Sequence, residues 1–397
     1  MHPICVICGL EIATANDSEE HILPGAIGGR RAVRGFLHDG CNHRSGHTWD
    51  AALERQLRPL ALHFGVKRQR GRTLRMAITT TAGENFLLNT GGQLEMSRPE
   101  IKRTPVPNGE TFQVKAGSIT MARDVLKGIK RKYPKVDVES VLARSEIQRT
   151  YAQGVVLIDL EFGGPVSGRS LVKSALALAH DAALPIDRCG DALAYLREAD
   201  AEPCFGYYYV NDLVDGRPQA TPLHCVAIDA NPNTGLILGY VEYFGIHRAV
   251  VCLGRGYTGE RLNAIYALDP RTGETLDVEV RLDFGAADIR AIYDYERDDA
   301  EKRQEAFGAV FGPALIAHHA AERERVVRDS LNFAWTKCGG VPDQPLAAEH
   351  LARLKELFAD QATPWWMHVT GLGEPAARQF ALTYISQVLA AAQSTPV

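Results

Sequence analysis

The sequence has no uninterrupted run of roughly twenty apolar residues, the length that a membrane-spanning helix needs. It has no secretory signal peptide, because Met1 leads directly into a cysteine motif. Internal repeats and long low-complexity segments are also missing. We therefore expect a cytoplasmic protein that does not span a membrane.

A strong excess of positive charge, common in proteins that bind nucleic acid, is missing as well, since the net charge is −4. That average hides two basic stretches. Residues 51–80 hold seven basic side chains and one acidic one (net +6), and residues 101–135 hold nine and two (net +7). Residues 181–220 are acidic, at −5. This asymmetry predicts a positive surface that contacts phosphates.

Paired metal ligands are present only near the N-terminus. They form two short motifs, Cys5-x-x-Cys8 and His38-x-x-Cys41, and two such pairs close a tetrahedral zinc site with no open position. A ligand set that uses His2 or His43 stays open as an alternative. Five other cysteines stand singly, without metal spacing, and we expect them to be packing residues: Cys189, Cys204, Cys225, Cys252 and Cys338.

Acid–base side chains lie between the two motifs. Glu20-His21 precedes an apolar pair and Pro24, as at the end of a short strand, and Gly28-Gly29 permits a turn. Residues 42–57 have helical spacing, with apolar side chains along one face. The order predicts strand, turn, strand and helix, held at the base by zinc.

The whole run resembles the HNH endonucleases, whose ββα-metal finger cuts nucleic acids. The resemblance covers about the first fifty-five residues. It implies that His21 is the general base, and that Glu20 and Asn42 hold a divalent ion. Asp50, on the same helix as Asn42, is either an outer partner of these ligands or an ordinary polar residue.

Two features depart from the family pattern. His38 stands where the second motif usually has a cysteine, which still leaves four zinc ligands. The middle Asn of the family name has no counterpart in residues 30–37, which leaves open how the loop that carries His21 is held.

The chemistry suits these residue types. A neutral imidazole can deprotonate water near neutral pH, as phosphodiester hydrolysis requires. Oxygen ligands such as those of Glu20 and Asn42 suit Mg²⁺ or Mn²⁺, which would offset charge in the transition state.

For the whole chain we predict an α+β protein in three segments. These are an HNH nuclease finger (1–60), a β-rich basic segment that contacts nucleic acid (61–164), and an α+β body of unknown role with a helical C-terminal tail (165–397). Within them, residues 154–162 are expected to form a buried strand and residues 170–183 an alanine-rich helix. Two strand pairs are expected further on, 205–214 with 224–228 and 236–244 with 249–253.

The predicted activity is metal-dependent endonuclease cleavage, with DNA the expected substrate and a homodimer as one way to cut both strands. The alternatives are a zinc-finger nucleic-acid-binding protein that does not cut, and a ligand-triggered defence or toxin effector.

Overall fold

The computed structural model describes residues 3–68, 75–107, 109–146, 150–340 and 347–393. The protein is mixed α+β, with a cysteine–histidine cluster near the N-terminus and a helical C-terminal tail, which confirms the predicted fold class. Its contacts define two compact units. Unit 1 comprises residues 1–79, 85–122 and 156–314, and unit 2 comprises residues 80–84, 123–155 and 315–397.

The centre of unit 1 is a five-stranded antiparallel sheet in the order β13-β10-β11-β12-β8. Its strands are β8 (Phe205–Tyr207), β10 (His224–Asn231), β11 (Leu236–Tyr243), β12 (His247–Arg255) and β13 (Leu262–Leu268). Alternate residues of β10 face opposite sides, and Val226 and Ala227 lie in two different hydrophobic clusters. Both faces are covered, so the middle strands are apolar almost throughout.

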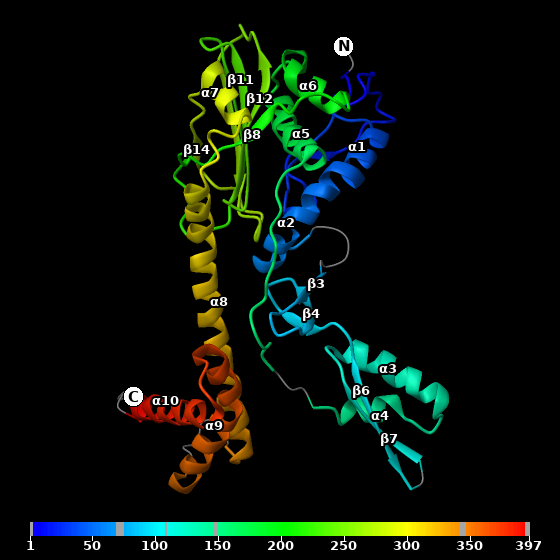
Figure 1. The fold of residues 1–397 in the computed structure, drawn as a ribbon, viewed down its shortest axis with the longest axis vertical. Helices are drawn as coiled ribbons and strands as arrows, with labels where there is room; N and C mark the ends of the chain where they lie inside the picture. Colours follow the sequence, from blue (N-terminus) through cyan, green and yellow to red (C-terminus); the bar gives the residue numbers. More distant parts are fainter. Residues whose placement is uncertain (1–2, 69–74, 108, 147–149, 341–346, 394–397) are drawn as a thin grey trace. The chain divides into compact units, whose positions relative to one another are not determined.

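Helix α5 (Pro165–Asp181) covers one face of this sheet (Figure 1). Gly163 and Gly164 adopt positive φ angles of 109° and 92°, and Pro165 then occupies the first helical turn, so the helix begins where the glycines end. All residues from 167 to 179 are buried. On the other face of the sheet, α7 (Ala286–Tyr293) contributes Ile289 and Ile292 to the second cluster.

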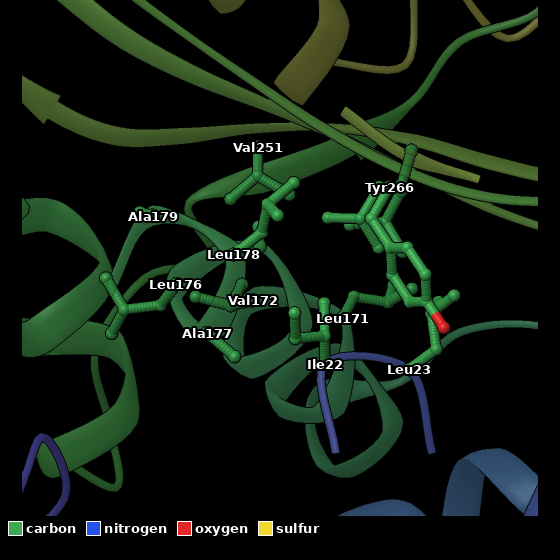
Figure 2. Close-up of a cluster of buried hydrophobic side chains, with 14 of the residues drawn as sticks. Ile22, Leu23, Leu171, Val172, Leu176, Ala177, Leu178, Ala179, Val251 and Tyr266 are labelled. Carbon is green, nitrogen blue, oxygen red and sulfur yellow. The ribbon is translucent and has the colours of Figure 1, made fainter. Parts of the chain in front are cut away.

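The N-terminal finger packs against α5. It consists of β1 (Glu20–His21), β2 (Ala32–Val33), α1 (Asp39–Ser45), a π-helical turn (Gly46–Asp50) and α2 (Ala51–His63). Strands β1 and β2 are antiparallel, so the predicted order of strand, turn, strand and helix is present. Figure 2 shows Ile22 and Leu23 of the finger beside Leu171 of α5 and Tyr266 of the sheet. Finger and sheet therefore share one hydrophobic core.

The rest of the described β-structure is small. It comprises β3 (Arg75–Thr79), β4 (Asn85–Asn89), β5 (Leu94–Met96), the hairpin β6 (Glu100–Val106) with β7 (Gly109–Lys115), and the pair β9 (Val214–Asp215) with β14 (Glu279–Val280). The hairpin stands largely in solvent, because every described residue of β6 is exposed.

The remaining helices are α3 (Ile119–Lys132), α4 (Val138–Ala143), α6 (Gly190–Arg197), α8 (Ala300–Lys337), α9 (Ala348–Thr370) and α10 (Glu374–Gln393). In unit 2, α9, α10 and the second half of α8 enclose a separate apolar core that includes Phe358, Trp365 and Ile385. No described helix combines the length and apolarity that crossing a bilayer demands.

Two sequence-based expectations about strands were wrong. Residues 154–162 form no strand, and most of their side chains are partly or fully exposed. Residues 205–214 were expected to pair with 224–228, whereas β10 pairs with β11 and β13, and β8 pairs with β12. The compact units also cut across the three predicted segments, which stay a prediction about function.

Candidate metal centre and active site

The four predicted zinc ligands come together. The ligand atoms of Cys5, Cys8, His38 and Cys41 all lie within 4.8 Å of one another, which is compatible with a tetrahedral ion bound by three thiolates and one imidazole. No other such group of three or more ligands was found among the described residues. His43 lies outside this set, and His2 lies outside the described residues, so the cluster matches the ligand set first expected.

Hydrogen bonds orient the histidine of this cluster. His38 Nδ1 lies 3.1 Å from Cys8 Sγ, and its Nε2 lies 2.9 Å from the carbonyl oxygen of Glu11. A proton on Nε2 therefore donates to this carbonyl and leaves Nδ1 for a metal, an arrangement typical of metal-binding histidines.

The electrostatics of the cluster also suit a cation. Burial alone raises the pKa of the Cys5 thiol, but backbone hydrogen bonds at Cys8 and His38 outweigh it and lower this pKa. Burial and the nearby Cys5 raise the pKa of Cys41 to about 11. Crowded sulfurs that resist joint ionisation are stabilised by a positive ion between them.

His21, the predicted general base, lies on β1 opposite Ala32 of β2. It is partly exposed, and its ring packs 3.5 Å from the position that a Cβ atom on Gly25 would take. The imidazole thus lies over the turn that follows β1, at the boundary between core and solvent.

Asn42 ties the loop before β1 to the helix. Its Nδ2 donates to the carbonyl oxygen of Glu19 at 2.9 Å and to Ser18 Oγ at 3.2 Å. Ser18 Oγ in turn donates to the carbonyl oxygen of Leu37 at 2.8 Å. These bonds hold the segment that leads into His21, even though the middle Asn of the family pattern is missing. They also leave the side-chain oxygen of Asn42 as its acceptor atom.

Glu20, the predicted metal-binding carboxylate, is only 4% exposed and faces α5. Its Oε1 lies 2.5 Å from Lys173 Nζ, and the same ammonium group lies 2.7 Å from Asp50 Oδ2. Ser170 Oγ donates to Asp50 Oδ1 at 2.5 Å. The structure therefore brings Glu20 and Asp50 together around a lysine, while His21, the next residue along β1, points elsewhere.

Charge and burial compete in this cluster. Burial raises the pKa of Glu20, Lys173 lowers it, and the net result is a raised pKa. Burial alone would lower the pKa of Lys173, but Asp50 and Glu20 outweigh it and raise this pKa well above the usual value. The two carboxylates thus favour the charged form of Lys173.

Lys173 and Ser170 were not predicted from the sequence as site residues. One signal was present: Lys173 interrupts an alanine- and leucine-rich helix whose neighbouring positions are apolar or small. A lysine on a buried helix requires a counter-charge, and this requirement points to an acidic partner elsewhere in the fold.

Part of the basic charge of residues 51–80 is paired with an acidic side chain of the same region. Arg58 and Arg68 both pair with the buried Glu54, at 2.7 and 3.0 Å. Arg70 and Arg72 lie outside the described residues. On the hairpin, Lys102, Arg103 and Lys115 belong to strands open to solvent. Helix α3 ends in the exposed Lys130 and Lys132, with Arg131 between them.

The clustered ligands and the ββα order define a zinc-knuckle finger of the ββα-metal class. Comparison with known families identifies it further, since residues 5–58 match the HNH endonuclease family. The predicted resemblance to the HNH endonucleases is thereby confirmed for this segment. Neither a curated protein nor a solved structure matches the chain. Lys173 and Ser170 lie outside the matched segment.

Proposed function

We propose that the protein is a metal-dependent endonuclease that hydrolyses phosphodiester bonds, with DNA as the expected substrate. The main support is that one HNH-family segment contains a complete cluster of zinc ligands and, on the strand beside it, the histidine of the (Asp/Glu)-His pair. Structural zinc would hold the two ends of this segment together.

In this proposal His21 accepts a proton from the attacking water. A partly exposed imidazole can be neutral at physiological pH and can reach solvent and substrate together. Its backbone is fixed by the β1–β2 pair, and the Ile22 amide donates to the Arg31 carbonyl at 3.0 Å. A fixed strand limits the movement of the ring relative to a bound phosphate.

Glu20 and Asn42 would hold Mg²⁺ or Mn²⁺ through a carboxylate oxygen and the side-chain amide oxygen. The donor chemistry fits, because both are hard oxygen ligands, and the amide nitrogen of Asn42 is already engaged by Glu19 and Ser18. When bound, such an ion supplies positive charge that offsets the charge developing on the phosphate and the leaving oxygen.

Substrate would be held by the exposed basic side chains of the β6–β7 hairpin. Lysines and arginines on open strands can follow a phosphate backbone, and the exposed Arg103 lies over the Phe112 ring at 5.8 Å from its centroid. A homodimer would bring two fingers to the two strands of a duplex.

Cleavage of supercoiled plasmid tests the proposal. We expect the zinc-loaded protein to nick plasmid in Mg²⁺ or Mn²⁺, and His21→Ala to lose at least about a hundredfold in rate, because it lacks the general base. The matched control is His318→Ala, which replaces an exposed histidine of α8 and should cleave normally.

Equal cleavage by the native protein and His21→Ala would contradict the assignment of the base. DNA binding without any metal-dependent product, in a protein with full zinc content, would instead support a non-catalytic nucleic-acid-binding protein. One observation favours that second function: Glu20 is buried and ion-paired rather than open to solvent.

A further inference from the structure

Lys173 joins the HNH domain to a helix more than a hundred residues further along the chain. Its side chain is 1% exposed, and its ammonium group contacts Glu20 and Asp50, both from the finger. Ser170, one turn earlier on α5, fixes the other oxygen of Asp50. Three charged groups and a hydroxyl thus form one cluster that only the folded unit 1 can assemble.

We propose that Lys173 is a positioning residue of the nuclease site, which holds the Glu20 carboxylate through Oε1 and leaves Oε2 as the oxygen for the divalent ion. This inference rests on the proposed function of Glu20. Carboxylates that bind metals are commonly fixed by an outer hydrogen-bonding partner, and loss of such a partner typically lowers metal affinity or activity 10–100-fold.

The surroundings of Lys173 explain how it could act in this way. A buried ammonium group has few alternative partners, because leaving its carboxylates would strand a charge away from water. Asp50 is itself held by Ser170, which lies on the same helix as Lys173, so the second partner of the ammonium group is also fixed relative to α5. Glu20 is therefore held from one side by a rigid helix.

The positive charge of Lys173 suggests an alternative role, in which this residue replaces the divalent ion. If Lys173 merely took the place of a cation between the two carboxylates, its removal would leave an empty acidic site and strengthen binding of divalent ions. If it positions Glu20, its removal should weaken that binding. The two roles therefore predict opposite signs.

The test is Mn²⁺ binding to the full-length, zinc-loaded chain, followed by the EPR signal of free Mn²⁺. Glu20→Gln defines which part of the binding depends on Glu20. We expect Lys173→Met to raise the dissociation constant of that part about 10–100-fold. The single variant Lys173→Met leaves two buried carboxylates without a counter-charge. The double variant Asp50→Asn with Lys173→Met avoids this, because it removes one charge of each sign. We expect the double variant to weaken Glu20-dependent Mn²⁺ binding by the same factor.

Ser174→Ala is the matched control. Ser174 is also buried on α5, but its hydroxyl pairs with Tyr243 at 3.2 Å, so Mn²⁺ affinity should not change. Unchanged or tighter Mn²⁺ binding in the folded double variant would overturn the proposal, as would a native protein without Glu20-dependent Mn²⁺ binding. A native protein that binds Mn²⁺ through Glu20 but leaves plasmid intact would overturn only the nuclease activity.

Discussion

Position 29 accepts only glycine, because the backbone of Leu23 lies too close to leave room for a side chain. A Cβ atom at this position would lie 1.8 Å from the carbonyl oxygen of Leu23, well inside any tolerable contact. Gly28 is restricted in a different way, because its φ angle is +109° and a Cβ atom would also meet the carbonyl oxygen of Pro270 at 2.8 Å. Both glycines hold the turn between β1 and β2 against the rest of unit 1.

Gly29→Ala should therefore destabilise the protein by more than about 2 kcal/mol, because the backbone of Leu23, two residues from His21, would have to move. Denaturant unfolding of the purified variant measures this change. Gly40→Ala is the control, since nothing lies within 4 Å of a Cβ atom there and alanine suits a helix. Equal unfolding free energies for the two variants would contradict the close approach.

At the scale of single residues, most of the candidate site residues could be predicted from spacing within short motifs. The four predicted zinc ligands come from two short motifs, each of which is a property of a few adjacent residues, and the structure brings them together. Lys173 could not be found in this way, because its partners Glu20 and Asp50 are distant in the chain. The contacts of Asn42 with Ser18 and Glu19 likewise depend on the folded loop.

At the scale of elements, the cysteine–histidine cluster links the first turn of the chain to the start of α1. Cys5 and Cys41 are buried in the same hydrophobic cluster as Leu171 and other residues of α5. Loss of the ion should therefore loosen the packing of the finger against α5 and not only its tip.

Cys8→Ser should reduce bound zinc to well below one ion per chain and lower the melting temperature, because the remaining three ligands hold the ion less tightly. Elemental analysis after dialysis and thermal unfolding measure the two effects. Cys338→Ser changes a cysteine of the unit 2 core and should retain zinc fully. Zinc retained equally by both variants would contradict the assignment of Cys8 as a ligand.

The sequence predicted helices better than strand pairing. Helix α5 follows from a Gly-Gly-Pro break and an alanine-rich run, both local signals. Residues 154–162 have a strand-like composition, but the structure gives them only an isolated bridge at Val156, and composition does not report on pairing. The pairing of β10 with β13 joins segments separated by two other strands, a choice made by packing on α5 and α7.

At the scale of the whole molecule, unit 1 contains two fully buried histidines that burial keeps neutral. The pKa values of His224 and His247 are both lowered to about 4 by burial. Below pH 6.5 the unfolded chain takes up protons at these positions, whereas the folded protein does so only near pH 4. The contribution of these two histidines to the free energy of unfolding therefore falls as the pH drops from 6.5 to 4.

Between pH 7 and pH 5, the free energy of unfolding of His247→Phe should fall by roughly 1–2 kcal/mol less than that of the native chain. Neither ring nitrogen of His247 has a hydrogen-bond partner among the described residues, and its neighbours Phe162, Tyr207 and Tyr243 are aromatic. The variant should thus be as stable as the native chain at pH 7, or more so. Thermal unfolding at pH 7 and pH 5 measures how much stability is lost on acidification. The control His318→Phe should lose as much as the native chain. An equal loss in His247→Phe would contradict the burial argument.

The division of the chain into two compact units is the feature that was hardest to predict from the sequence. Each unit is assembled from separate stretches of the chain, so no single break in composition marks the boundary. The basic stretches are visible in the sequence, and Arg58 and Glu54 are an i,i+4 pair within α2, but the pairing of Arg68 with Glu54 depends on the fold of the segment after α2.

The shared core of finger and sheet limits how this HNH domain could be exchanged between proteins. His224 Nε2 donates to the carbonyl oxygen of Ile27 at 2.9 Å, and its Nδ1 accepts from the Phe244 amide at 3.0 Å. Residues 5–58, moved alone into another chain, would lose this bond together with the counter-charge of Glu20 and Asp50. For engineering, we therefore expect the smallest transferable unit to be the finger together with α5 and the sheet that shares its hydrophobic core.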